Sequence, residues 1–202
     1  MMRLMKLDEA RAIAEEVVAR LAPLCERVEV AGSIRRTEVE VGDIEIVYQS
    51  RMGFVDGQLL DVHQYPLSDD AIADMVDDGL LAYDEEVRRN GPLYKRMVHR
   101  ATGIAVELFR ATAENWGLIL ALRTGPAAFN KMLVAHGWEG GVLPPDYKVR
   151  DGRLWYRGVA QRTAEESDLF DALGMPTWPP WQRHPGRLKL WHEAQRRVQV
   201  YD

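Results

Sequence analysis

Two short stretches of the chain carry side chains that could bind a phosphate and a divalent metal. Gly32 and Ser33 follow a β-branched run, and a Gly-Ser turn offers backbone N–H groups to phosphate oxygens. Asp43 and Glu45 are two apart in a second such run, so on a strand both carboxylates lie on one face. Carboxylates are hard oxygen ligands for Mg²⁺, and a pair of ions about 3.5–4 Å apart needs carboxylates converging from one side. The pattern predicts a phosphate and metal site, with a plain polar strand face as the alternative.

A third carboxylate and an arginine complete this candidate site. Glu107 is the only acid in the apolar run 104–109, where an unpaired carboxylate is costly without a metal or a basic partner. The alternative for Glu107 is a salt bridge to an arginine. Arg36 can bind phosphate through two parallel N–H bonds, whereas the alternative for Arg35 and Arg36 is a surface pair bound to the glutamates that follow them. Neither a P-loop nor a Gly-x-Gly-x-x-Gly pattern competes with this interpretation.

A mixed β-sheet with flanking helices is expected to position these residues. Apolar residues at helical spacing predict a helix over 7–24 that ends at Pro23, and Ser68 is the expected N-cap of a helix over 68–77. Strands are expected at 28–31, 44–48, 80–87, 94–100 and 104–109. Asn90-Gly91 is a hairpin signal. Meandering strands after a helix indicate an α+β fold.

Beyond Ala111 the pattern changes to helices. Helices are expected at 113–122, 126–136 and 165–173, with a small hairpin formed by 147–149 and 154–156. The hairpin is expected to turn at Asp151-Gly152, and Gly174 to stop the last helix. The boundary between two domains, 1–112 and 113–202, is therefore placed near residue 112.

Composition bounds the class of protein. Without a membrane-length apolar run or a signal peptide, the chain of 202 residues is expected to be a soluble, cytoplasmic protein that binds no membrane. One cysteine excludes an intramolecular disulfide and a cysteine zinc cluster. The net charge of −5 argues against a nucleic-acid partner, but ten acids lie within 56–86, so the remainder carries +5. Two segments are basic, 87–110 and the tail from Trp181, and ordinary solvated surfaces are the alternative.

In these motifs the chain resembles the family X DNA polymerases of the nucleotidyltransferase superfamily. Residues 31–36 and 42–45 resemble the Gly-Ser-x-Arg-Arg turn and the Asp-x-Asp pair of that family. Further resemblance lies in Val106-Glu107-Leu108 at the third carboxylate, Arg123 to Asn130 at the Thr-Gly-Ser-x-x-Phe-Asn signature, Thr163 to Pro176, and Pro179-Pro180. The resemblance implies a minimal form, with a nucleotidyltransferase palm (1–112) and a small helical and hairpin C-terminal thumb subdomain (113–202).

Site roles follow from this resemblance. Two ions of Mg²⁺, or of Mn²⁺, would be held by Asp43, Glu45 and Glu107, which are the catalytic residues. The nucleotide would be bound by Gly32, Ser33, Arg36, Gly42, Arg123, Thr124, Gly125 and Asn130. Gly125 would form the turn beneath the sugar, Asn130 would reach the minor-groove edge of the base, and Lys131 would touch the templating base of bound DNA. A 3′-hydroxyl would attack the α-phosphorus in line, with pyrophosphate leaving.

The chain departs from the family pattern at residues that bear on turnover. Glu45 and Glu107 replace aspartates, and the extra methylene moves each carboxylate by about 1.5 Å. Such a displacement can cost on the order of a hundredfold in rate. Leu122 and Arg123 replace an aromatic pair beneath the sugar, which predicts weak discrimination between ribo- and deoxyribonucleotides.

The expected function is addition of nucleotides to a nucleic-acid 3′-hydroxyl, in DNA repair or gap filling, by a monomer that uses nucleoside triphosphates. One alternative is a template-independent terminal, RNA or small-molecule nucleotidyltransferase. The other is a catalytically weak module that binds DNA ends or nucleotides, which the two glutamates and the acidic total suggest.

Overall fold

The computed structural model describes residues 4–56, 62–84 and 90–198. The chain packs into two compact units. Unit 1 comprises Met1–Ile34 and Glu38–Thr112, and unit 2 comprises Arg35–Thr37 and Ala113–Asp202. Each unit has its own cluster of buried apolar residues. The prediction of an α+β chain with a mixed sheet and flanking helices is confirmed.

Unit 1 is built on a five-stranded sheet in the order β2-β4-β9-β8-β7. Its strands are β2 (Cys25–Val30), β4 (Asp43–Ser50), β7 (Leu81–Tyr83), β8 (Tyr94–His99) and β9 (Ala105–Arg110). The two central strands, β4 and β9, are parallel, and every other pair is antiparallel. Alternate apolar residues of the central strands, such as Ile44 and Val106, are fully buried. The sheet is therefore fixed by one apolar face.

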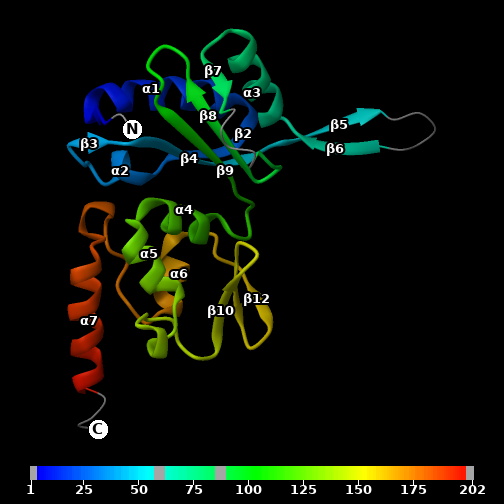
Figure 1. Ribbon diagram of the computed structural model, residues 1–202. Helices are drawn as coiled ribbons and strands as arrows, with labels where there is room; N and C mark the ends of the chain where they lie inside the picture. The colour runs from blue at the N-terminus through cyan, green and yellow to red at the C-terminus, as the bar shows by residue number, and fades with distance from the viewer. Residues whose placement is uncertain (1–3, 57–61, 85–89, 199–202) are drawn as a thin grey trace. The chain divides into compact units, whose positions relative to one another are not determined.

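Two helices cover that apolar face, as Figure 1 shows: α1 (Leu7–Leu21) and α3 (Ser68–Asp77). The sequence predicted both helices, and α1 is followed by the 3-10 turn η1 (Ala22–Leu24), which contains Pro23. The N-cap prediction for α3 was wrong. Leu67 is the N-cap residue, and Ser68 instead donates its backbone N–H to Ser50 Oγ at 3.0 Å.

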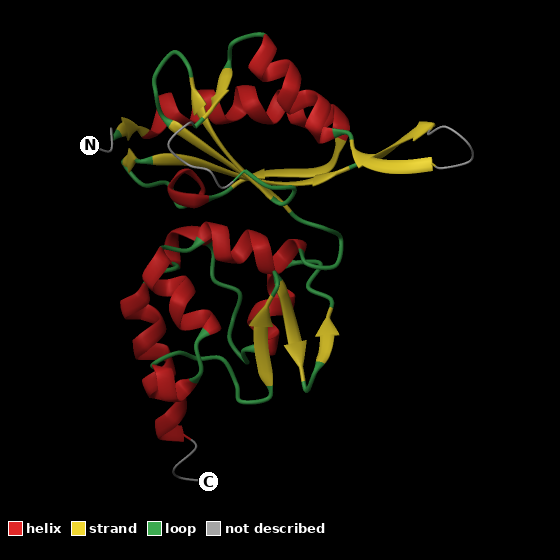
Figure 2. Cartoon of the chain, turned by 45° about the vertical axis from the view of Figure 1, so that its right-hand side comes forward, coloured by secondary structure: helices red, strands yellow, loops and turns green. Residues whose placement is uncertain are grey.

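Smaller elements complete unit 1. They are the pair β1 (Met5–Lys6) and β3 (Glu40–Val41), the single turn α2 (Gly32–Arg35), whose last residue belongs to unit 2, and the hairpin of β5 (Met52–Asp56) and β6 (Val62–Pro66). This hairpin extends past the edge of the sheet in both views (Figures 1 and 2) and was not predicted. The strand expected over 80–87 is observed as β7 over Leu81–Tyr83, and residues 85–87 of that prediction lie outside the described ranges.

Unit 2 combines helices with a three-stranded sheet in the order β10-β11-β12, seen in Figure 2. The strands are β10 (Tyr147–Arg150), β11 (Arg153–Tyr156) and β12 (Val159–Gln161). The helices are α4 (Trp116–Thr124), α5 (Ala127–Val134), α6 (Glu166–Ala172) and α7 (Pro185–Val198), with 3-10 turns η2 (Gly137–Glu139) and η3 (Pro180–Gln182). The sequence did not predict β12 or α7.

Close backbone packing joins α4 to the start of α6. A Cβ on Gly117 would lie 2.0 Å from the carbonyl oxygen of Glu165, so only glycine fits there. The core around these helices is aliphatic and aromatic, and Phe129 and Phe170 are fully buried in it. The strands β10 and β11 and the helix α6 are held in place because each contributes apolar side chains to this core.

Candidate functional site

The three predicted carboxylates lie on one face of the unit 1 sheet. In the parallel register of β4 and β9, Glu45 is paired with Glu107, and Asp43 with Ala105. Ile44, next to Asp43 and Glu45, is fully buried in the core under α1 and α3, so the carboxylates point to the opposite face. All three are half-buried. The structure therefore brings together acids that lie far apart in the sequence.

Glu107 is held by two donors from the neighbouring strand β8. Arg96 Nη1 donates to Glu107 Oε1 at 2.5 Å, and the Tyr94 hydroxyl donates to the same oxygen at 3.0 Å. The hydrogen bond to Asp84 and those to Glu107 raise the pKa of Arg96, which thus stays protonated. The salt bridge that was the alternative for Glu107 is present.

Burial and the Glu107 carboxylate together raise the pKa of Tyr94. Its phenol therefore stays protonated at neutral pH and remains a donor. Tyr94 also stacks on Phe109 at 5.1 Å between ring centres, which fixes the ring on the same face of the sheet. Tyr94 and Arg96 were not among the site residues predicted from the sequence. The available signal was their spacing, because residues two apart on a strand lie on the same face.

The Gly-Ser turn lies directly against the acid pair. Gly32 has φ +61°, a conformation that favours glycine, and a Cβ there would lie 2.3 Å from Glu45 Oε2 and displace that carboxylate. Ser33 Oγ is buried and has no hydrogen-bond partner in the described part of the chain. Gly42 immediately precedes β4 and is half-buried. A buried hydroxyl without a partner is uncommon and calls for an explanation such as a bound ligand or water.

The carboxylates of Asp43, Glu45 and Glu107 are suitable ligands for a divalent metal and lie on neighbouring strands in a suitable register. In their present positions, however, these side chains do not converge on one point. No group of three or more His, Cys, Asp or Glu residues within the described ranges is arranged to hold a metal ion. Arg96 already binds Glu107 Oε1. Metal binding through Oε2, or exchange of the Arg96 bond, is required for all three carboxylates to act as ligands.

Arg35 and Arg36 pack with unit 2. Arg36 Nη1 donates to the Thr124 carbonyl at 2.7 Å, and Arg35 Nη1 donates to Thr124 Oγ1 at 2.8 Å. Arg35 also forms a bidentate ion pair with Glu166, both distances being 2.9 Å. Arg35 is therefore not a surface residue paired with the glutamates that follow it. It stabilises unit 2.

Asn130 closes the turn between α4 and α5. Its Nδ2 donates to the carbonyls of Leu122 and Gly125, each at 2.6 Å, while its buried Oδ1 has no partner among the described residues. A Cβ on Gly125 would lie 2.2 Å from that Oδ1. Arg123 and Lys131 are exposed on α4 and α5. In this arrangement Asn130 and Gly125 depend on each other sterically.

Most described cations of the two basic segments have structural partners. In 87–110, Lys95 pairs with Asp69 at 3.4 Å, and Arg100 donates to the Leu81 carbonyl at 3.3 Å. In the tail, Arg183 is buried, and Arg187 lies 4.7 Å from the centre of the Trp178 ring. Arg88 and Arg89 lie outside the described residues.

Comparison with models of known protein families gives no match to this chain, and neither does comparison with curated proteins. Over the described ranges, no helix has the length and apolar character needed to cross a bilayer.

Proposed function

We propose that this protein is a metal-dependent nucleotidyltransferase that adds nucleotides to the 3′-hydroxyl of a nucleic acid. The observation that carries the proposal is the register of β4 and β9, which pairs Glu45 with Glu107 and keeps Asp43 on the same face. The close approach of Gly32 to Glu45, and the buried hydroxyl of Ser33, which has no hydrogen-bond partner in the described part of the chain, add support. The class of fold is consistent with the family that the sequence resembles.

Each residue has a distinct task in this proposal. Asp43, Glu45 and Glu107 would hold Mg²⁺ or Mn²⁺, which supplies charge stabilisation to the reacting phosphate when bound. Ser33 Oγ donates to a phosphate oxygen. Arg96 and Tyr94 bind Glu107 Oε1 and so fix the orientation of the carboxylate.

A second candidate is a module that binds nucleotides or nucleic-acid ends without turnover. The Arg96–Glu107 ion pair favours it, because a guanidinium already neutralises the third carboxylate, whose side chain is 14% exposed. The two candidates share one binding site and differ only in whether the metal gains access to Glu107.

Primer extension distinguishes them. The purified chain is incubated with a labelled primer, nucleoside triphosphates and either Mg²⁺ or Mn²⁺, on templated and on single-stranded primers. Asp43→Asn is expected to abolish all product while leaving the fold intact. Asp77→Asn is the matched control, since it removes an equal charge from an exposed position on α3.

Templated products support a polymerase, and untemplated tails support a terminal transferase. Loss of product in Asp43→Asn but not in Asp77→Asn supports the assigned carboxylates. No product with either metal, together with retained binding of triphosphate in a calorimeter, would establish the binding module. Absence of both product and triphosphate binding would reject the site.

A further inference from the structure

The three-stranded sheet of unit 2 has two chemically different faces. In the register of β10 and β11, Tyr147 pairs with Tyr156 and Val149 with Leu154. Leu154 is buried in the unit 2 core, against which Tyr147 and Val149 also pack. Because side chains alternate along a strand, the intervening residues point away from the core. These residues form the outer face defined by Lys148, Arg150, Arg153 and Trp155.

The outer face is basic. Lys148 and Arg150 are exposed on β10, and the residues of β10, β11 and β12 include no acid. Arg150 and Arg157 pair with the flanking Asp151 and Asp146 at 3.1 and 3.0 Å. Both pairs are exposed, with 66% and 67% of the arginine side chains accessible, so each is readily exchanged for another anion.

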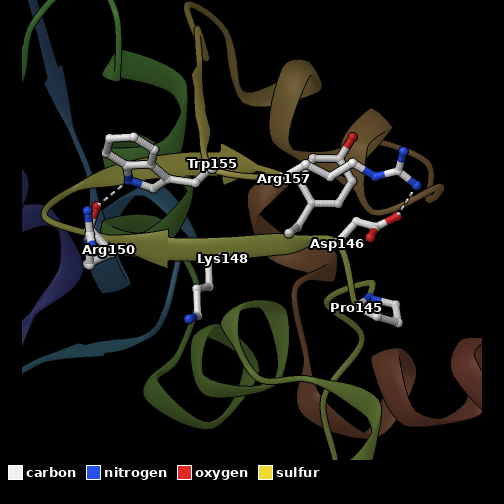
Figure 3. Close-up of a pocket in the computed structure, with 8 residues that line it drawn as sticks. Pro145, Asp146, Lys148, Arg150, Trp155 and Arg157 are labelled. Atoms are coloured by element: carbon white, nitrogen blue, oxygen red, sulfur yellow. Dashed lines mark hydrogen bonds and ion pairs between the residues drawn. The ribbon is translucent and has the colours of Figure 1, made fainter.

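A pocket of about 430 Å³ opens on this side of the sheet, lined in part by Lys148, Arg150, Trp155 and Arg157. Figure 3 shows Trp155 and Arg150 side by side, with the indole N–H bonded to the Arg150 carbonyl at 3.2 Å. The Arg150 guanidinium lies 5.1 Å from the centre of the Trp155 ring. A planar cation over an aromatic ring forms a platform on which a further flat group can stack.

Cations spaced along a strand beside an aromatic platform suit a single-stranded nucleic acid. Lys148 and Arg150 are two residues apart, about 6.6 Å along the strand, which is of the order of the step between successive phosphates of an extended strand. Phosphates would bind these cations, and an unpaired base would stack on the Trp155–Arg150 platform. The outer face is distinct from the two basic segments, 87–110 and the tail from Trp181, in which several described cations have structural partners.

We propose that the outer face of β10 and β11 binds single-stranded nucleic acid through Lys148, Arg150 and Trp155. The choice of partner rests on the proposed function, but binding requires no turnover. The outer face would thus bind the strand to which the proposed transferase adds nucleotides.

Fluorescence anisotropy of the full chain with a labelled single strand of about 16 nucleotides tests the proposal, with DNA and RNA in separate arms. The Asp43→Asn background prevents extension. Lys148→Ala/Arg150→Ala is expected to weaken binding at least tenfold and to lower the slope of log affinity against log salt by about 1.4. Lys6→Ala/Arg51→Ala, which removes two exposed cations of unit 1, is the matched control and is expected to bind like the parent.

Trp155 provides an independent readout. Trp155→Ala is expected to weaken binding about tenfold with the salt slope unchanged, and Trp155→Phe to restore most of it, since a phenyl ring still stacks. Thermal unfolding confirms that each variant is folded.

Three outcomes would overturn the proposal: no binding of the strand, equal binding by Lys148→Ala/Arg150→Ala and the control, or competition by inorganic triphosphate at equal phosphate concentration, which indicates a small-anion site. If the parent chain binds the strand but extends no primer, only the proposed function is rejected. Extension with unchanged primer KM in the Lys148→Ala/Arg150→Ala variant would reject only this binding face.

Discussion

Replacement of Glu166 by glutamine is expected to lower the free energy of unfolding of unit 2 by about 3–5 kcal/mol. Glu166 lies between two arginines. Arg183 Nη1 donates to its Oε1 at 2.5 Å, and Arg35 donates to both carboxylate oxygens at 2.9 Å. Only 1% of the Arg183 side chain and 13% of the Glu166 side chain are accessible to solvent. The cluster is thus a nearly buried set of charges in which one carboxylate compensates two guanidinium groups.

The magnitude follows from the bonding capacity of the amide. Glutamine has one acceptor oxygen in place of two, whereas three guanidinium N–H bonds end on Glu166. At least one N–H group therefore faces the amide NH₂ without an acceptor, and Arg183 loses its counter-charge. The Nε of Arg183 also donates to the Trp178 carbonyl at 3.0 Å, and its guanidinium lies over the Phe170 ring, but neither group carries a compensating charge. Removal of one partner from a buried pair costs more than the pair itself contributes, because the other charge stays buried.

The same cluster predicts how stability depends on pH. Burial opposes the ionisation of Glu166, but the hydrogen bonds and charges of Arg183 and Arg35 outweigh burial and hold its pKa below the ordinary value of 4.5. A depressed carboxyl pKa contributes stability that is fully present above the unfolded-state pKa and is lost as the pH falls through the folded-state pKa. The difference between the parent protein and Glu166→Gln should therefore be largest near neutral pH and shrink below pH 4.5.

Urea denaturation, followed by the fluorescence of the unit 2 tryptophans, measures these differences. Arg183→Met and Glu166→Gln/Arg183→Met complete a double-mutant cycle, and the double variant should lose about 1–3 kcal/mol less than the sum of the single variants. Arg187→Met is the control, because Arg187 is exposed and stacks on Trp178 in a similar way, and its expected cost is below about 1 kcal/mol. A Glu166→Gln variant as stable as Arg187→Met, or a difference independent of pH, would refute the reasoning.

Three further predictions concern single sites. Gly117→Ala should destabilise by roughly 1–3 kcal/mol, since the new Cβ meets the Glu165 backbone at 2.0 Å, whereas Gly91→Ala has open space and should be near neutral in the same urea titration. Burial raises the pKa of the Cys25 thiol to about 11, so alkylation by iodoacetamide at neutral pH should be far slower in the native protein than in urea; equal rates would contradict the burial. Arg96→Met should tighten Mn²⁺ binding measured by calorimetry with triphosphate present, because the guanidinium no longer neutralises Glu107. Unchanged affinity in that variant would show that Arg96 does not compete with the metal.

Local pattern predicted the elements that depend on local physics. The helices predicted over 7–24 and 68–77 correspond to α1 and α3, the β-branched runs 28–31 and 44–48 to β2 and β4, and the strand-like runs 94–100 and 104–109 to β8 and β9. The alternation within β4 was sufficient to place Asp43 and Glu45 on one face. The hairpin β5–β6, the edge strand β12 and the helix α7 were not predicted. The strands are short and form by pairing with their neighbours, and α7 is largely polar although its apolar residues have helical spacing.

The sequence by itself therefore determined which residue types stand two apart on a strand and which glycine can adopt a positive φ beside them. The tertiary structure decided their partners: the pairing of Glu45 with Glu107, the capture of Glu107 by Arg96, and the ion pair of Arg35 with Glu166, 131 residues further along. Strand register and helix docking follow from burying whole apolar faces at once, so the neighbour of a polar side chain is set by packing elsewhere in the unit and not by the residues beside it in the chain.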